Sequence, residues 1–369
     1  MTFDNFLETV NCPICDRSDY QVLRKANYSE NITRQKLLEI YKSSSDTELI
    51  DQVVKCLECG LVYLNPRVQS DIILESYSEA IDPKFTSQNP LRIRTFRKFL
   101  DHWIKRTKIT PSVKKKILDL GCAAGSFPKV AEDMGFSVVG VEPSKYLCEF
   151  GQREYGLDLR QGTLHDQNFS EGEFNIVSMF DVIEHLDQPG YVLDEIKRIL
   201  HSEGQLIVNY PEYDSWPRKL MGAKWPFFLN VHLFYFTPKS IKQILEKHGF
   251  FVIRAEPYYQ TLELGYILER ASQIFSFAKC DTVFSPPAAS KCQTLVYALL
   301  LSSVFTAFSM PSLQPPIAIL CFCEIFCTSV TKAGSISSAF WPFAAHTGDF
   351  TQAPAVSSAP LLDISHQLG

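Results

Sequence analysis

The sequence predicts an α/β protein whose core is a doubly wound, largely parallel sheet. Continuous apolar runs without polar alternation recur between segments that have a helical apolar period. Strands of this kind are buried on both faces, and helices cover them. The first such run ends in the turn DLGCAAGSF, which opens a helix. A glycine turn between a strand and a helix is the usual place for a nucleotide-like ligand in such a sheet.

Strands and helices are expected to alternate over residues 115–258. The expected strands are KILDLG, SVVGVEP, LDLRQG, FNIVSMFD, GQLIVNYP and FFVIRAEP. The expected helices are residues 124–134, a helix that Ser144 caps, PGYVLDEIKRIL and TPKSIKQILEKHGF. Residues 67–112 precede them as a helical linker or cap, in which NPLRIRTFRKFLDHWIKR has apolar residues at helical spacing. We therefore expect the main domain to cover residues 113–300.

Composition and charge exclude some classes of function. The net charge is −5, and the short basic clusters are read as helix faces and a strand entry, so nothing indicates a nucleic-acid-binding protein. The N-terminus has no basic segment followed by an apolar one, which predicts no secretory signal and a cytoplasmic protein.

The acids near the glycine turn indicate the chemistry of the ligand. Asp119 stands two residues before Gly121, where a carboxylate would repel a pyrophosphate. It suits a ligand with positive charge, such as S-adenosylmethionine with its sulfonium and ammonium groups. Gly121 and Gly125 let the backbone approach a ligand closely, and Glu142 ends the next strand, where an acid can accept hydrogen bonds from ribose hydroxyls. The alternative is a strand–turn–helix unit that binds no ligand.

From about residue 115 to residue 257 the chain resembles class I S-adenosylmethionine-dependent methyltransferases. The motifs that carry the resemblance are ILDLGCAAGSF, VVGVEPS, QGTLHD, FNIVSMFDVIEHLDQP and LHSEGQLIVNYP. The resemblance implies a Rossmann-like sheet of seven strands. It also implies these contacts with the cofactor: Asp119, Gly121 and Gly125 at the methionine moiety, Glu142 at the ribose, Thr163 and Leu164 at the adenine, and Phe180 at the sulfonium. Asn175 departs from the Asp of many relatives at a peripheral position.

Two C-x-x-C pairs in residues 1–66, Cys12 with Cys15 and Cys56 with Cys59, predict a zinc-knuckle module. Each pair turns two thiolates toward one ion, and four thiolates complete the closed tetrahedral shell of a structural Zn²⁺. A redox pair or unrelated thiols are the alternatives. The stretch CLECGLVYLNPR resembles the N-terminal zinc module of bacterial methyltransferases associated with sugar, surface-glycan or lipid tailoring, and a related arrangement occurs in deoxysugar C-methyltransferases.

Two histidines are candidates for catalysis, because an acceptor hydroxyl needs a base. His185 follows the fourth strand in DVIEHLDQP. This stretch resembles the E-x-x-E-H pattern of ubiquinone-biosynthesis O-methyltransferases, where those side chains hold a divalent ion, and Asp181, Glu184 and His185 occupy the matching positions. His232 lies in an aromatic segment that suits an acceptor pocket, with walls from Tyr213, Trp216, Trp225, Phe228 and Tyr235. The alternatives are a capping contact for His185 and a packing cluster around His232.

The resulting expectation is an enzyme that transfers a methyl group from S-adenosylmethionine to a small-molecule or glycan acceptor, with O-methylation favoured. One alternative is C-methylation of a nucleotide-linked deoxysugar. The other is an inactive methyltransferase-like scaffold whose zinc module binds a partner. The expected cofactors are S-adenosylmethionine and structural zinc.

Residues 301–369 differ in composition from the rest of the chain, with one lysine and three acidic residues. Their apolar stretch is broken by prolines into pieces shorter than the ~20 residues that span a bilayer. A disordered or non-native-like tail, a membrane-associated hairpin and a folded domain are the three interpretations. KCQTLVYALL, residues 291–300, resembles the final antiparallel strand of the fold. We therefore expect the native fold to end near Leu300 and the remainder to arise from a frameshift or read-through.

Overall fold

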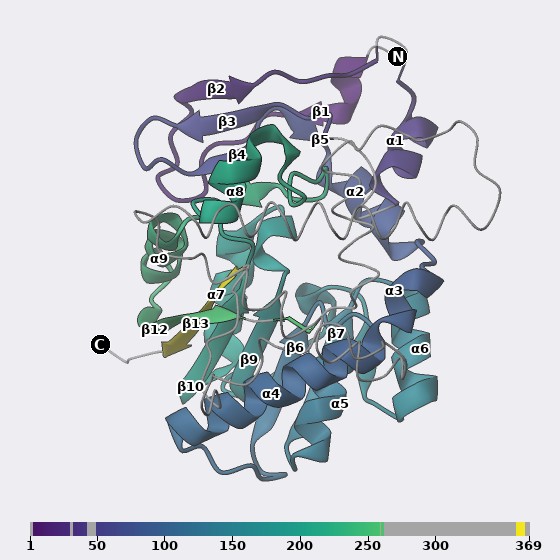
Figure 1. Cartoon of the computed structure of the whole chain (residues 1–369), viewed down its shortest axis with the longest axis vertical. Coiled ribbons are helices and arrows are strands. Elements are labelled where there is room, and N and C mark those ends of the chain that lie inside the picture. The colour runs from purple at the N-terminus through teal and green to yellow at the C-terminus, as the bar shows by residue number, and fades with distance from the viewer. Residues whose placement is uncertain (1–2, 30–31, 43–48, 259, 262–358, 366–369) are drawn as a thin grey trace, which may run out of the picture. The chain divides into compact units, whose positions relative to one another are not determined.

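The computed structural model describes residues 3–29, 32–42, 49–258, 260–261 and 359–365. These residues hold a seven-stranded sheet, a four-stranded sheet and a two-stranded one (Figure 1). The seven-stranded sheet has the strand order β12-β13-β10-β9-β6-β7-β8. Its strands are β6 (Lys116–Leu120), β7 (Ser137–Glu142), β8 (Leu159–Gln161), β9 (Phe174–Phe180), β10 (Leu200–Asn209), β12 (Phe251–Tyr258) and β13 (Ala359–Ser365).

Five of these strands, β8, β7, β6, β9 and β10, pair in parallel, as the sequence predicted for the core of the sheet. The chain runs from β6 outward to β8 and then crosses back to β9, so the strand order reverses between β6 and β9. Ligands bind outside the carboxyl ends of the strands at such a reversal. The topology therefore points to the edge where β6, β7 and β9 end.

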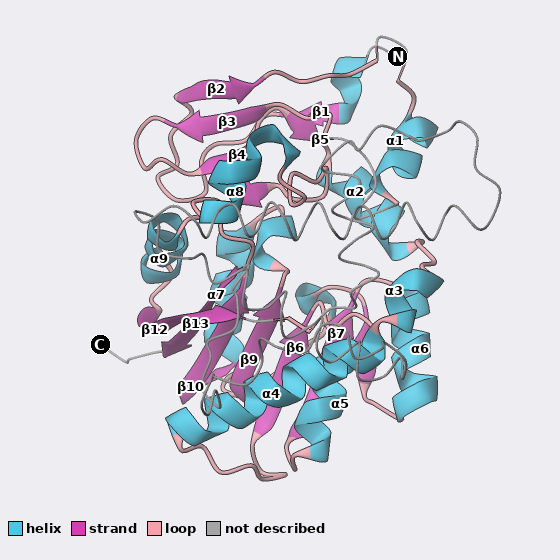
Figure 2. Ribbon diagram, in the orientation of Figure 1, coloured by secondary structure: helices cyan, strands magenta, loops and turns pink. Residues whose placement is uncertain are grey.

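Helices cover both faces of this sheet (Figure 2). On one face, α4 (Asn89–Thr107) and α5 (Ser126–Asp133) pack Leu100, Trp103 and Phe127 against the strands. On the other face, α7 (Pro189–Ile199) and α9 (Pro238–Lys247) bury an apolar stripe each. α6 (Lys145–Tyr155) packs Cys148 beside β8. Burial on both faces explains why the strands lack polar alternation.

The N-terminal part forms its own small sheets. Its elements are η1 (Phe3–Phe6), β1 (Leu7–Glu8), β2 (Tyr20–Arg24), α1 (Arg34–Tyr41), β3 (Val53–Cys56), β4 (Val62–Leu64), β5 (Arg67–Val68), α2 (Ser70–Ser78) and α3 (Pro83–Ser87). The four-stranded sheet has the order β11-β4-β3-β2. Its edge strand β11 (Phe234–Tyr235) comes from the segment after β10, so the main domain contributes one strand to the N-terminal sheet.

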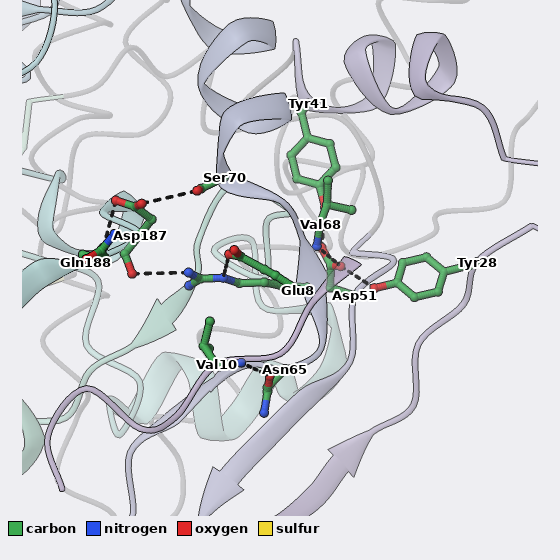
Figure 3. Close-up of polar contacts among 11 residues, drawn as sticks. Glu8, Val10, Tyr28, Tyr41, Asp51, Asn65, Val68, Ser70, Asp187 and Gln188 are labelled. Atoms are coloured by element: carbon green, nitrogen blue, oxygen red, sulfur yellow. Dashed lines mark hydrogen bonds and ion pairs between the residues drawn. The ribbon is translucent and has the colours of Figure 1, made fainter. Parts of the chain in front are cut away.

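A polar joint ties the N-terminal part to the segment that follows β9 (Figure 3). Arg67 is 2% exposed, and its guanidinium donates to Glu8 Oε1 at 2.6 Å and to the Asp187 carbonyl at 3.3 Å. Ser70 Oγ also donates to Asp187 Oδ2 at 3.3 Å. The Asp51 carboxylate also holds β5, because its Oδ1 accepts the Val68 N–H at 3.2 Å. Through these contacts, the N-terminal part fixes Asp187, two residues after His185.

The strand β13 differs from the sequence prediction. Residues 359–365 pair antiparallel with both β10 and β12, at the place in the sheet for which residues 291–300 were expected. Residues 291–300 and 301–358 lie outside the described residues. The low charge of the C-terminal region did not argue against a strand, because strand pairing depends on backbone groups rather than on charge. The native fold therefore does not end near Leu300 in this structure.

Candidate active site

The glycine turn after β6 has a shape that only glycine allows. Gly121 and Gly125 have left-handed φ angles of +62° and +77°, and Gly125 is the N-cap of α5. A Cβ on Gly121 would lie 2.5 Å from Val182 Cγ2, and one on Gly125 would lie 2.5 Å from Leu157 Cδ1. Both the conformation and the contacts require glycine. The predicted turn is present, and it packs on the residue that follows Asp181.

Asp119 lies at the reversal point of the sheet. It is 3% exposed, it stands opposite Ser178 of β9 in the register, and its Oδ1 accepts the Ser178 hydroxyl at 2.7 Å. Burial raises the pKa of Asp119 to about 8, although the Ser178 hydrogen bond acts to lower it. A nearby cation would favour the ionised form. The carboxylate therefore suits the positively charged methionine moiety of S-adenosylmethionine.

Glu142, at the end of β7, is fully buried and held by several donors. It accepts the Ala123 N–H at 3.0 Å and the Ser144 N–H at 2.8 Å, and the Tyr77 hydroxyl of α2 also donates to it. Burial raises the pKa of Glu142 to about 7, and these hydrogen bonds oppose the rise. A carboxylate has about four lone-pair sites, so the backbone donors aim it and leave acceptor capacity for a ribose hydroxyl.

Of the other three predicted cofactor residues, Thr163 and Leu164 follow β8, and Phe180 is the last residue of β9. Thr163 donates its N–H and its hydroxyl to Asp166 at 2.7 and 2.8 Å, which caps η2 (Leu164–Asp166), and Leu164 is 6% exposed. The Phe180 ring packs among aromatic rings, including Phe96 at 4.9 Å between centroids. The structure thus brings these residues to the same edge of the sheet as Asp119 and Glu142.

A second cluster lies just beyond β9, in η3 (Ile183–His185) and the segment before β11. The His185 and His232 rings meet edge to face, with centroids 4.7 Å apart. His185 Nδ1 lies 2.8 Å from the Val231 carbonyl, and His232 Nδ1 lies 2.9 Å from the Phe227 carbonyl. A carbonyl only accepts, so both Nδ1 atoms carry the proton. Each Nε2 then keeps its lone pair.

Glu184 completes this cluster. It is 1% exposed, and neither carboxylate oxygen has a hydrogen-bond partner in another of the described residues. One potential ligand atom from each of Glu184, His185 and His232 lies within 4.8 Å of the other two. Burial raises the pKa of Glu184 and lowers that of His185 to about 4. Burial also lowers the pKa of His232, so both imidazoles are neutral near neutral pH.

The grouping differs from the predicted set of Asp181, Glu184 and His185. Asp181 has a left-handed φ of +55° and is not part of the group, although its charge helps burial to raise the pKa of Glu184. His232 occupies the third place instead. Sequence reasoning singled out His185 and His232 separately, but no local signal joins residues that far apart in the chain.

The aromatic residues predicted as pocket walls pack mainly on one another. Tyr213, Trp225, Phe228 and Tyr235 have ring centroids 5.2–6.3 Å apart, and Trp225 and Tyr235 are buried. Trp216 is 49% exposed and stands outside these ring contacts. The cluster is therefore a packed support for the segment that carries His232, as the alternative interpretation of the sequence had it.

The four N-terminal cysteines converge as predicted. Sγ of Cys12 lies 3.4 Å from that of Cys59, Sγ of Cys15 lies 3.4 Å from that of Cys56, and all four sulfurs lie within 4.8 Å of one another. Zn–S bonds of about 2.3 Å in a tetrahedron place sulfurs about 3.8 Å apart, so the spacing fits one zinc ion.

The two C-x-x-C pairs also share a backbone turn. The residue after each pair, Asp16 or Gly60, has a left-handed φ of 59° or 81°. Its N–H donates to the carbonyl of the first cysteine, at 2.8 Å in one pair and 3.1 Å in the other. Backbone N–H groups also point at the sulfurs of Cys12 and Cys56. Burial raises the pKa of Cys12 and these donors oppose the rise, whereas at Cys56 the donors outweigh burial and the pKa falls to about 7.

Comparisons with known proteins identify a methyltransferase domain in this chain. Residues 92–255 match a family model described as a methyltransferase domain. A ubiquinone biosynthesis O-methyltransferase from Bartonella quintana is 24% identical over 180 residues, which cover 45% of this chain and 72% of that protein. A protein of the same description from Azorhizobium caulinodans is 28% identical over 131 residues, 33% of this chain and about half (51%) of that protein.

A solved structure of an S-adenosylmethionine-dependent methyltransferase from Archaeoglobus fulgidus is 13% identical, covers 77% of this chain and 100% of its own, and has a TM-score of 0.42.

The strand order, the glycine turn and the two buried acids define a class I methyltransferase domain. With the family match and the names of the relatives, the protein is an S-adenosylmethionine-dependent methyltransferase. Among the described residues, no helix combines the length and the apolar character that crossing a bilayer requires.

Proposed function

We propose that the protein transfers the methyl group of S-adenosylmethionine to a hydroxyl oxygen of a small molecule or glycan. The observation that carries the proposal is the pairing of His185 with His232 beyond β9, the strand whose Ser178 contacts Asp119. Imidazole Nε2 lone pairs near the methyl donor suit an acceptor that loses a proton as it attacks. The curated relatives named as O-methyltransferases support the same acceptor atom.

In this proposal the cofactor half of the site is built from β6, β7, the segment after β8 and the last residue of β9. Asp119 and the backbone at Gly121 and Gly125 hold the methionine moiety, and Glu142 holds the ribose. Thr163 and Leu164 lie at the adenine, and Phe180 lies at the sulfonium. The chemical step is an in-line displacement at the methyl carbon, so positioning of the two reactants supplies much of the rate acceleration.

The four-cysteine cluster is proposed to hold one structural zinc ion. A closed shell of four thiolates leaves no open position for chemistry. The zinc ion would stabilise the N-terminal sheet. In that sheet β4 pairs with β11, and Leu64 N donates to the carbonyl of Leu233, the residue after His232, at 2.9 Å. The zinc module therefore supports the segment that carries one of the two catalytic histidines.

The proposal is tested by mass spectrometry of the product formed from a methyl-labelled cofactor and a panel of phenols, catechols and sugar nucleotides. The expected result is formation of S-adenosylhomocysteine that depends on the acceptor, with the label in a methyl ether. A label on carbon or nitrogen of the accepted compound would contradict the proposed acceptor atom. Calorimetry with S-adenosylhomocysteine, run beside it, checks the cofactor half independently.

A further inference from the structure

We infer that a groove between the N-terminal sheet and α8 (Trp216–Met221) binds a small molecule that carries a phosphate group on an apolar body. The groove has a volume of about 360 Å³, which lies within the range of ~300–1,000 Å³ that is usual for small-molecule sites. Lys55 and Val62 line it from the N-terminal sheet, and Arg218 lines it from α8. The inference goes beyond the proposed function, since it makes no use of the two histidines or of the cofactor residues.

The strand pairing of the N-terminal sheet forms the floor of the groove. Lys55 of β3 and Val62 of β4 are register partners, and Val62 is also the partner of Tyr235 in β11. Side chains at paired positions lie on the same face of a sheet. Tyr213 packs on Tyr235, with ring centroids 5.8 Å apart, whereas Val62 and Lys55 line the groove together with the exposed Leu23.

The Arg218 guanidinium is held in place and has hydrogen-bonding capacity left. Its central carbon lies 4.0 Å from the centroid of the Tyr213 ring, and one of its Nη atoms donates to the Tyr213 hydroxyl. A guanidinium has five N–H donors. Among the described residues, that hydroxyl is the one acceptor that the guanidinium meets, and Nε is buried without any. A bound phosphate would supply further acceptors, and the planar fork of an arginine matches phosphate oxygens.

The charge of the groove favours a dianion. Neither Lys55 nor Arg218 forms an ion pair with a carboxylate in the part of the chain that the structure describes. Asp214 also lines the groove, but its carboxylate pairs with Lys219 Nζ at 2.9 Å. Two unpaired cations match a phosphate monoester, whose charge is about −2. The apolar walls then suit the rest of the molecule.

Aromatic ring contacts separate the groove from the proposed catalytic histidine. The ring centroids of Tyr213 and Trp225 are 6.1 Å apart, those of Trp225 and Phe227 are 5.3 Å apart, and Phe227 stacks on His232 at 6.3 Å. These three contacts lie between the wall of the groove and the imidazole, and His232 does not line the groove. The groove is therefore a site of its own.

The test measures binding by calorimetry on the full chain, purified in the presence of zinc. The probe is naphthyl phosphate at about pH 8, where a phosphate monoester is a dianion. Naphthol lacks the phosphate, and inorganic phosphate lacks the apolar body. The variants are Arg218→Gln, Lys55→Gln and Asp214→Asn. The matched control is Lys224→Gln, which removes an exposed cation of η4 (Gly222–Lys224) that does not line the groove.

We expect naphthyl phosphate to bind the wild type and the control equally, and naphthol and inorganic phosphate to bind at least about 10-fold more weakly. Arg218→Gln should weaken binding about 10- to 100-fold, because hydrogen bonds between two charged groups are lost. Lys55→Gln should weaken it only about 2- to 5-fold, since Lys55 is exposed. Asp214→Asn should strengthen it about 2- to 5-fold, a gain that misfolding would not produce.

The inference would be overturned by any of three results. The first is no binding of naphthyl phosphate by the wild type at millimolar concentration. The second is wild-type affinity in Arg218→Gln, whose fold is checked by circular dichroism. The third is equal affinity for naphthol or for inorganic phosphate, which would contradict the chemical class of the ligand. None of these measurements involves methyl transfer, so their outcome leaves the proposed function unaffected.

Discussion

The proposed cofactor half and the proposed acceptor half of the active site each contain a buried glutamate, and the hydrogen bonding of the two glutamates differs. Glu142 accepts two backbone N–H groups and the Tyr77 hydroxyl. Glu184 is just as buried and accepts no hydrogen bond from any other residue that the structure describes. The Glu142 carboxylate is therefore oriented by the protein's own donors.

The difference follows from where the donors come from. Ala123 and Ser144 belong to turns that follow β6 and β7, so a parallel sheet delivers their N–H groups to Glu142 automatically. The surroundings of Glu184 come from η3 and from the segment around His232, whose side-chain polar atoms are aimed at backbone carbonyls. Variants of the two halves should therefore separate cofactor affinity from turnover.

The largest effect is expected from the histidines. Replacing His185 or His232 with Ala should lower turnover by roughly 10²–10⁴, the usual contribution of a group that handles the acceptor proton. Affinity for S-adenosylmethionine should stay close to that of the wild type. Initial rates with saturating cofactor and calorimetric dissociation constants measure the two quantities. Full activity in both variants would show that catalysis is purely positional.

A smaller loss, in affinity rather than in rate constant, is expected in the cofactor half. Asp119→Ala and Glu142→Ala should each weaken S-adenosylmethionine binding by about 10- to 100-fold, because a hydrogen bond to a charged group contributes about 1.5–3 kcal/mol. Calorimetry measures the affinity, and circular dichroism checks that the fold persists. Asp158→Ala, at an exposed residue paired with Arg160, is the control. Unchanged affinity in both test variants would refute the assignment of the cofactor residues.

Loss of the N-terminal zinc site should also loosen the segment that carries His232, because β11 follows that segment and pairs with β4. The purified protein should contain about one zinc per chain, since four thiolates make one closed site. Cys12→Ser or Cys59→Ser should lower the zinc content and expose the segment around β11 to proteases, because that strand pairs with β4. Elemental analysis and limited proteolysis measure the two effects. Retention of zinc in both variants would rule out the four-cysteine site.

The smallest effect concerns the stability of the cofactor-free protein. Burial raises the pKa of Asp119 from 3.8 to about 8 and that of Glu142 from 4.5 to about 7. Between the ordinary and the raised values, the folded protein holds more protons than the unfolded chain, so stability should fall as the pH rises from about 4 to about 8. Melting temperatures across this range should fall less in Asp119→Asn than in the wild type. If the melting temperature fell equally in Asp119→Asn and in the wild type, Asp119 would not be the cause of the pH dependence.

The parts of the site that could be predicted from the sequence depend on short stretches. The turn between Gly121 and Gly125 and the two C-x-x-C knuckles are set by spacings of a few residues. Asn175 was predicted to be peripheral, and its Oδ1 accepts the Lys116 N–H at 2.9 Å, at the end of β6 away from the site. The parallel core of the sheet followed from the apolar runs alone.

The remaining features depend on contacts between distant segments. The grouping of Glu184 with His232 follows from a backbone hydrogen bond between Leu233 and Glu184, and β11 joins a sheet formed some 170 residues earlier in the chain. Neither contact leaves a periodic signal in the sequence. The position of β13 was missed for the same reason, since a strand between β10 and β12 can be supplied by any suitable segment of the chain.

The pairing of β4 with β11 also limits how a gene for such a protein can be rearranged. A recombination point near residue 66 or residue 112 would separate the cysteines from the catalytic sheet in the sequence, yet Phe234 and Tyr235 would still need β4 as their neighbour. An exchanged N-terminal module would have to present the same strand edge. The two modules are therefore expected to be inherited as one unit, with acceptor preference changing by point substitutions rather than by module exchange.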